Sequence, residues 1–283
     1  WRSRHWRCRV RSVHASMTLV PAGGNCTRGY MINRYLAGDH GGPRLPPPRT
    51  FDHFQFGVPT EMKSAALWFP GYNTYWGFDS FEGLPDEDQD GRRKATNRGW
   101  TKGSMSLACT TDLSYARTAT GRCGGKVGIA NAVAEMRRYL RGNRTRTRLV
   151  PGYYSATLTP ELAQSARPAF YVDINCDLYV STSQALRWLF GNGLMRPGSL
   201  IMYDDWFAAP FGEGESLAHT RAAKSFGVTF KLLYRCTGTP KTVSPLQRGG
   251  FMNNLVLFRV EAVGGTSHDA GVVPALRHTK WTS

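Results

Sequence analysis

Residues 169–206 read AFYVDINCDLYVSTSQALRWLFGNGLMRPGSLIMYDDW, and this stretch decides the fold. The apolar run at 169–174 predicts a strand, the pattern at 181–190 predicts a helix, and 198–203 predicts a second strand. Because a helix between two strands carries the chain back to the edge where it started, the two strands are expected to be parallel neighbours in one sheet.

The same alternation of strand and helix extends on both sides of this unit. Further strands are predicted at 51–57, 74–79, 149–150, 228–234 and 255–260, and further helices at 60–69, 126–140, from Thr159 onward and at 215–226. We therefore predict an α/β fold: a doubly wound, mostly parallel, Rossmann-like sheet of seven strands with helices on both faces. The last two strands have no clear helix between them, which predicts an antiparallel hairpin at the sheet edge.

This α/β domain is expected to cover residues 51–263, with a polar lid or insert loop at 85–125. Residues 1–50 contain many Arg and Pro residues and are predicted to be an N-terminal arm and linker, and 264–283 a C-terminal tail. The arm is compatible with a targeting remnant, and a first residue of Trp favours a start inside a longer precursor. The compartment stays open.

Composition excludes several classes of protein. The chain is 41% hydrophobic and 12% aromatic, which excludes global disorder. No run approaches the roughly 18 uncharged apolar residues of a membrane span, so we expect a soluble protein. The net charge of +16 is concentrated at 1–38 and 91–149. One hypothesis for the segment 91–149 is a lid whose charges are solvated or recruit an anionic or glycosylated substrate. A weaker hypothesis is nucleic-acid binding through this segment, with Trp100 and Tyr115 as stacking residues.

Residues at the strand ends are the candidate functional residues, because ligands bind beyond the carboxyl ends of such strands. Gly57 ends the first predicted strand and would let the backbone approach a cofactor. Asp79 ends the second and is placed to accept hydrogen bonds from ribose hydroxyls. No G-x-G-x-x-G pattern includes Gly57, so a nucleoside cofactor without phosphates is favoured over a dinucleotide. An ordinary strand-to-helix turn would also explain these two residues.

Acidic residues follow two neighbouring predicted strands. Asn175 and Asp177 come after one, and Asp204 and Asp205 come after the other. If the strands are adjacent, these oxygen ligands meet, and a divalent cation such as Mg²⁺ would relieve their repulsion. The alternative is that Asp177 caps the following helix and Asp205 faces water.

Four strings in this order resemble one family. GFDSFEGLP at 77–85, DLYVST at 177–182, PG at 197–198 and YDDW at 203–206 are similar to motifs of the macrocin O-methyltransferase-like family. Its members are class I S-adenosylmethionine-dependent methyltransferases, and the resemblance covers roughly residues 51–235. It implies S-adenosylmethionine and Mg²⁺ as cofactors, and a small-molecule hydroxyl acceptor that includes glycosylated compounds. Homo-oligomerisation is compatible with the sequence.

The resemblance also implies roles for single residues. Gly57, Asp79, Ser80 and Phe81 would contact the cofactor. Asn175, Asp177, Asp204 and Asp205 would hold magnesium, and the first three of these would act in catalysis by binding or deprotonating the acceptor hydroxyl.

Asn175 departs from the family pattern, which has an aspartate at the first position of D-x-D-L-Y. An amide oxygen can bind a metal but cannot take a proton, so a catalytically degenerate binding module is the alternative hypothesis. Asp173 lies two residues earlier, on the same side of the strand by alternation, and is a candidate to supply the missing charge.

Overall fold

The structure is a computed structural model that describes part of the chain. Several predicted segments lie outside the described residues. They are the helix at 60–69, the tail at 265–283, and most of the loop at 85–125 and of the basic segment at 91–149. The described residues are 18–20, 27–42, 46–58, 71–86, 102–103, 106, 130, 133–134, 136–137, 146–206, 213–236 and 255–264.

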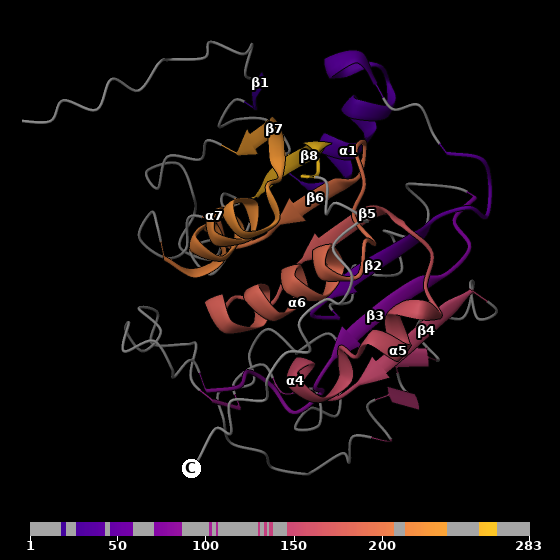
Figure 1. Ribbon diagram of the computed structural model, residues 1–283, viewed down its shortest axis with the longest axis vertical. Helices are drawn as coiled ribbons and strands as arrows, with labels where there is room; N and C mark the ends of the chain where they lie inside the picture. The colour runs from indigo at the N-terminus through magenta and orange to yellow at the C-terminus, as the bar shows by residue number, and fades with distance from the viewer. Residues whose placement is uncertain are drawn as a thin grey trace, which may run out of the picture.

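Within these residues eight strands form one sheet in the order β1-β7-β8-β6-β5-β2-β3-β4 (Figure 1). Their bounds are β1 Thr18–Val20, β2 Asp52–Phe56, β3 Tyr75–Asp79, β4 Thr147–Pro151, β5 Ala169–Ile174, β6 Leu200–Tyr203, β7 Thr229–Cys236 and β8 Val256–Ala262. Strand β8 runs antiparallel to both β6 and β7, and every other pairing is parallel. The predicted seven-stranded Rossmann-like sheet, β2 to β8, is confirmed, as is the antiparallel pair near its edge.

Strand β1 is an addition that the sequence analysis did not predict. Thr18 pairs with Tyr234, so β1 extends the sheet beyond β7. The N-terminal 50 residues thus contribute a strand to the sheet.

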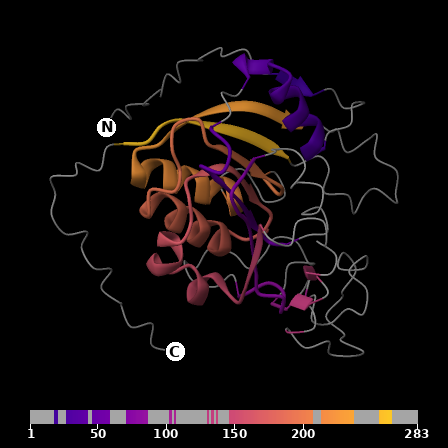
Figure 2. The ribbon, with the colours of Figure 1, turned by 90° about the vertical axis from the view of Figure 1, so that its right-hand side faces the viewer.

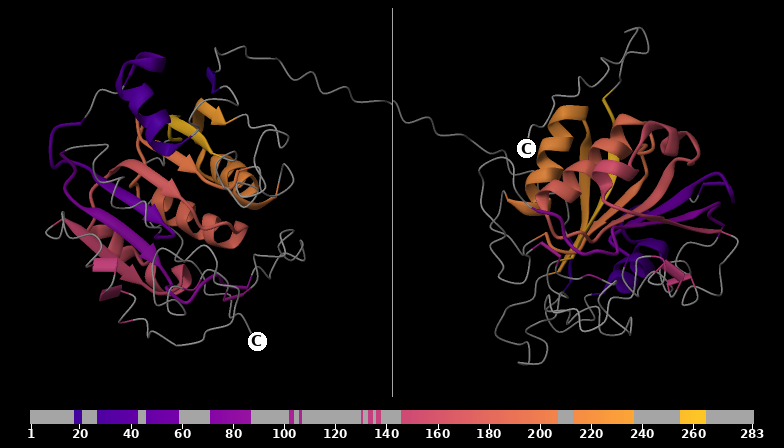
Figure 3. Two further views of the ribbon diagram at one scale, coloured as in Figure 1. Left: turned by 180° about the vertical axis from the view of Figure 1, so that it is seen from behind. Right: turned by 90° about the horizontal axis from the view of Figure 1, so that it is seen from below.

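Helices cover both faces of the sheet. Their bounds are α1 Arg28–Leu36, α4 Tyr154–Thr157, α5 Pro160–Gln164, α6 Tyr179–Gly191 and α7 Gly214–Phe226, with a short 3₁₀ turn η1 at Asp39–Gly41. Helices α6 and α7 lie on one face and α1 on the other (Figures 2 and 3). None of the helices in the described ranges is long and apolar enough to cross a bilayer.

The sheet is buried on both sides, and strand β6 illustrates how. Leu200 and Met202 belong to the apolar cluster on the α1 face, while Ile201 and Tyr203 belong to the cluster under α6 and α7. Successive side chains of a strand point to opposite faces, so a strand covered on both faces reads as a continuous apolar run. This explains why these strands were predictable from the sequence.

Helix α1 is part of the core although it lies within the expected N-terminal arm. Thr27 caps it by accepting a hydrogen bond from the Tyr30 amide at 3.1 Å. Met31, Ile32 and Tyr35 are buried in the same cluster as the strands. Arg28 precedes them by three, four and seven residues, so it lies on the same, sheet-facing side of the helix. The domain boundary at residue 50 stays a prediction.

Candidate functional site

The end of β2 approaches the chain that follows β5. Gly57 has φ +75°, and a Cβ atom at this position would lie 1.8 Å from the backbone oxygen of Asn175. The Gly57 amide also donates to the Phe78 carbonyl at 2.9 Å. Only glycine permits this conformation and this contact together, so the sequence places glycine where three strand ends converge.

Asp79 lies beside that turn, as the sequence predicts. Its Oδ2 accepts a hydrogen bond from the Val58 amide at 2.8 Å, and its Oδ1 accepts one from the Phe81 amide at 2.7 Å. Burial raises the pKa of Asp79, and the two amide hydrogen bonds act in the opposite direction. Each carboxylate oxygen can accept a further hydrogen bond, so the group could still bind a ligand hydroxyl.

Ser80 and Phe81 shape the turn after β3. The Ser80 hydroxyl donates to the Gly83 carbonyl at 2.8 Å and accepts from the Glu82 amide at 3.1 Å. Phe81 has φ +57° and is fully buried in the apolar cluster on the α1 face. Their contact with a cofactor stays a prediction.

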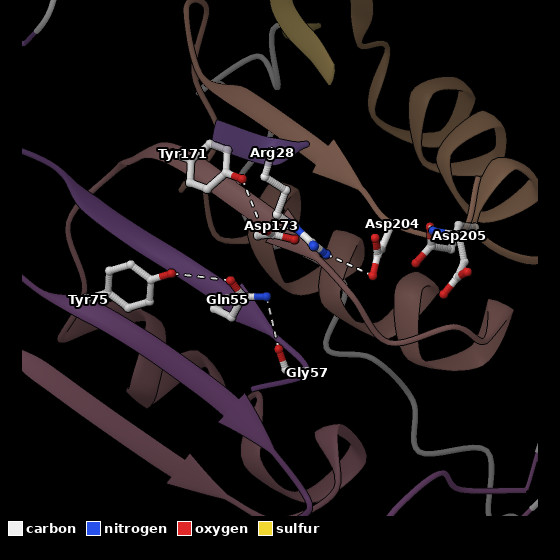
Figure 4. A network of polar contacts seen from close by, with 9 residues as sticks. Arg28, Gln55, Gly57, Tyr75, Tyr171, Asp173, Asp204 and Asp205 are labelled. Carbon is white, nitrogen blue, oxygen red and sulfur yellow. Dashed lines mark hydrogen bonds and ion pairs between the residues drawn. The ribbon is translucent and has the colours of Figure 1, made fainter. Parts of the chain in front are cut away.

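Arg28 joins the ends of β5 and β6. Its Nε lies 2.9 Å from Asp173 Oδ2, and its Nη2 lies 2.9 Å from Asp204 Oδ2 (Figure 4). The arginine side chain is 12% exposed and the two carboxylates 1% and 7%, so the three charges are largely shielded from water. Tyr171 donates a hydrogen bond to Asp173 Oδ2 at 3.0 Å.

Asn175 belongs to the same group, which we call the arginine cluster: Arg28, Asp173, Asn175 and Asp204. With the amide oriented so that donors meet acceptors, its nitrogen donates to Asp204 Oδ2 at 2.8 Å and its oxygen accepts from Arg28 Nη2 at 3.3 Å. Burial opposes the charge of Arg28, but Asp173 and Asp204 outweigh it and raise the pKa of the guanidinium well above its usual value.

A second group, the carboxyl cluster, consists of Asp177, Asp205 and Glu215. The Asp205 amide donates to Glu215 Oε2 at 3.0 Å, and neither carboxylate oxygen of Asp205 has a hydrogen-bond partner among the described residues. Burial raises the pKa of all three, that of Asp177 to about 6.

The alternative interpretation of these aspartates is therefore wrong. Helix α6 has Leu178 at its N-cap and no side-chain capping bond, so Asp177 does not cap it. Asp205 is only 2% exposed and does not face water. Asp177 has φ +60°, and this left-handed turn precedes α6.

The four predicted magnesium ligands are divided between the two clusters. Magnesium requires several oxygen atoms directed at one point. Asp204 Oδ2 and the Asn175 amide oxygen are instead directed at Arg28. Across the described ranges, no group of three His, Cys, Asp or Glu side chains could hold a metal ion. These residues therefore do not fit the magnesium site that the sequence analysis predicts.

Three further residues at this edge were not predicted from the sequence: the largely shielded Arg28 and the buried Gln55 and Glu215. Gln55 donates to the Gly57 carbonyl at 3.0 Å and accepts from the Tyr75 hydroxyl at 3.3 Å, so it supports the glycine turn (Figure 4). A polar residue inside the buried strand 52–56 was a signal for Gln55. The signal for Arg28 was Asp173, because an acid inside an apolar strand needs a buried partner.

Known proteins were compared by sequence and by structure. No protein-family model and no curated protein matches the sequence. Among solved structures, the O-methyltransferase NovP is 18% identical over 83% of this chain and 79% of its own, with a TM-score of 0.49. CalS11, a calicheamicin methyltransferase, is 17% identical over 82% and 76%, with a TM-score of 0.46. An O-methyltransferase from Bacillus cereus in complex with SAH is 10% identical over 82% and 79%, with a TM-score of 0.40. At these identities and TM-scores the likeness says nothing about activity, and the Rossmann-like sheet is established by its own strand order.

Proposed function

We propose that this protein is an S-adenosylmethionine-dependent O-methyltransferase that methylates a hydroxyl of a sugar-containing or other small-molecule acceptor. The observation that carries the proposal is the placement of Asp79 against the Gly57–Val58 turn, at the carboxyl edge of a doubly wound sheet. The motif resemblance to the macrocin O-methyltransferase-like family supports the same function.

The cofactor would lie over the Gly57 turn. Asp79 is already held in place by the Val58 and Phe81 amides, so it need not reorganise to accept hydrogen bonds from two ribose hydroxyls. Those bonds would favour its charged form and offset the effect of burial on its pKa. Gly57 would let the cofactor approach the backbone where a side chain would block it.

Methyl transfer is an in-line displacement. The acceptor oxygen forms a bond to the methyl carbon, the carbon–sulfur bond breaks with its electron pair remaining on sulfur, and the hydroxyl proton passes to a base. In this proposal Asp177 is that base. Its pKa of about 6 is closer to neutrality than that of an ordinary aspartate, which suits proton transfer. Asn175 has no basic group, and Asp204 is bound to Arg28.

Calorimetry with S-adenosylhomocysteine tests the proposal. Wild type is expected to bind, and Asp79→Ala to lose about 100-fold in affinity, because charge-assisted hydrogen bonds to the ribose are lost. Asp79→Asn keeps the size of the side chain but loses one of the two oxygens that accept the Val58 and Phe81 amides, so circular dichroism of both variants must show that they are folded. Asp86→Asn is the control, because the ion pair of Asp86 with Lys102 is exposed. Failure of the wild-type protein to bind would refute the cofactor assignment.

A second candidate function is binding of the cofactor without transfer. Asn175 favours it, because this amide cannot take a proton and is engaged with Arg28 and Asp204. Incubation with S-adenosylmethionine and a panel of sugar nucleotides and glycosylated hydroxyl compounds separates the two. Mass spectrometry that detects a methylated product favours the enzyme, and cofactor binding without any product favours the binding module.

A further inference from the structure

The guanidinium of Arg28 occupies the place where the sequence analysis expects a metal ion. It contacts Asp204 and Asn175, two of the predicted magnesium ligands, and also Asp173, the acid expected to supply further charge. Figure 4 shows Arg28 extending between Asp173 and Asp204, with Asp205 on the far side of Asp204. A cation supplied by the chain thus joins the ends of β5 and β6.

The arginine cluster pairs one internal cation with two carboxylates and an uncharged amide. Asp173 and Asp204 provide two negative charges and Asn175 none, so one guanidinium leaves a net charge of −1. An aspartate at 175 would provide a third carboxylate, and a divalent ion would then be needed to reach the same net charge. Asparagine at 175 and arginine at 28 are therefore complementary in charge.

The geometry of the cluster also suits a guanidinium. Its Nε forms an ion pair with Asp173 that lacks the alignment of a hydrogen bond, its Nη2 pairs with Asp204, and Nη2 also donates to the Asn175 amide oxygen. Three buried side chains of α1, Met31, Ile32 and Tyr35, anchor the helix that carries Arg28. The cation is thus fixed by the core of the protein and does not depend on an ion from solution.

We propose that Arg28 takes the place of a divalent cation at this strand edge, so that the protein holds its cofactor and acceptor without a bound metal. Arg28 acts as a positioning residue: it fixes the Asp204 carboxylate and the Asn175 amide. The part that concerns cofactor and acceptor rests on the proposed function, whereas the replacement of the metal does not.

Magnesium titration of the cofactor-free protein tests the replacement directly. Wild type, Arg28→Lys and the control Arg34→Met are expected to show no magnesium binding by calorimetry and no magnesium-dependent rise in melting temperature. Arg34 lies on the same helix but forms an exposed ion pair with Asp39. The double variant Arg28→Met with Asn175→Asp removes the internal cation and adds a carboxylate. We expect it to bind magnesium measurably, with a dissociation constant at least about tenfold below the highest magnesium concentration at which wild type shows no binding.

Stoichiometric magnesium binding by wild type that disappears in Asp204→Asn would overturn the proposal, and this arm does not require the double variant to fold. A folded double variant that binds magnesium no better than wild type would also overturn it. The Arg28→Lys variant keeps the positive charge and must therefore show no magnesium binding. If the role of Arg28 were merely structural, exclusion of magnesium would not require that charge.

Cofactor affinity separates this inference from the proposed function. S-adenosylhomocysteine is titrated into wild type with EDTA and then with excess magnesium. Equal affinities in both buffers support the inference, and a magnesium-dependent gain overturns it. If wild type binds no S-adenosylhomocysteine in either buffer, the proposed function fails, while the titration of the cofactor-free protein still decides whether Arg28 replaces the metal.

Discussion

The two halves of the sheet's carboxyl edge hold their carboxylates by different means. On the β2–β3 half, Asp79 is held by the backbone amides of Val58 and Phe81. On the β5–β6 half, Asp173 and Asp204 are held by the side chain of Arg28, which comes from a helix outside the strand–helix alternation. Backbone partners follow from the fold itself, whereas a side-chain partner depends on one residue. A single substitution should therefore disturb the second half most.

Removal of Arg28 should have the largest effect on stability. Arg28→Met leaves Asp173 and Asp204 as buried charges without their cation, and breaking a buried ion pair in this way costs about 3–5 kcal/mol. Arg34→Met removes an exposed ion pair on the same helix and should cost at most about 1 kcal/mol. Urea unfolding of both variants measures the difference. Equal losses would contradict the burial of charge around Arg28.

The β2–β3 half is sensitive through its backbone. Gly57→Ala would place a Cβ atom 1.8 Å from the Asn175 carbonyl oxygen, so the ends of β2 and β5 must separate, at a cost of about 3 kcal/mol. Gly103→Ala is the matched control, because Gly103 also has positive φ, +78°, but its Cβ would meet nothing within 4 Å. That change should cost about 1 kcal/mol, the strain of the conformation alone. Similar losses in urea unfolding would show that the close contact has no energetic weight.

These two variants separate what the sequence predicts from what it does not. Gly57 and Asp79 could be placed because each ends an apolar run, and parallel strands bring their ends to one edge. The strand boundaries were predictable for the same reason. Position 28 differs, because its helix lies in a segment that contains many arginines and ends in Gly and Pro. The sheet-facing side formed by Arg28, Met31, Ile32 and Tyr35 is recognisable only once that segment is treated as part of the domain.

The side-chain positions of the predicted magnesium ligands could not be derived from the sequence for a related reason. Strand alternation indicates which residues reach the edge, but not where their side chains turn beyond it. Asp205 lies in the carboxyl cluster because of two local features. Asp177 has a left-handed backbone conformation, and Glu215 on α7 accepts a hydrogen bond from the Asp205 amide. Asp173 signalled a need for a buried cation, yet the chain has 36 Lys and Arg residues, and nothing in the sequence selects Arg28 among them.

The carboxyl cluster should give the protein a pH dependence of definite sign. Because the pKa of both Asp177 and Asp205 is raised, the folded pair keeps a proton that the unfolded chain has lost above its own pKa. The unfolded state then binds fewer protons, so this contribution to stability is lost as pH rises through the folded pKa. For Asp177 alone, a pKa of about 6 corresponds to about 1 kcal/mol between pH 5 and 7.

Unfolding of wild type and of the double variant Asp177→Asn with Asp205→Asn at several pH values measures this term. His53 and His219, whose pKa burial lowers to about 3, are present in both proteins, so their contributions cancel in the difference. Comparison of wild type with Asp39→Asn should give a pH dependence of the opposite sign. The hydrogen bond from Arg34 lowers the pKa of Asp39, so the stability that Asp39 contributes is lost as pH falls through its folded pKa. A wild-type advantage that grows with pH would contradict the raised pKa of these two carboxyl groups.

The smallest effect tests whether α1 positions Arg28 or merely carries it. Thr27 and Thr159 are both capping threonines, and replacing either with alanine should cost about 1 kcal/mol. Thr27→Ala loosens the turn that contains Arg28, so its cost should not add to that of Asp204→Asn; a double-mutant cycle should show a coupling of at least about 0.5 kcal/mol. Thr159→Ala lies on α5, away from the arginine cluster, and should be additive with Asp204→Asn. Additivity in both cycles would mean that the Arg28 contacts survive a loosened helix end, and that the stability of the β5–β6 half depends on the guanidinium alone.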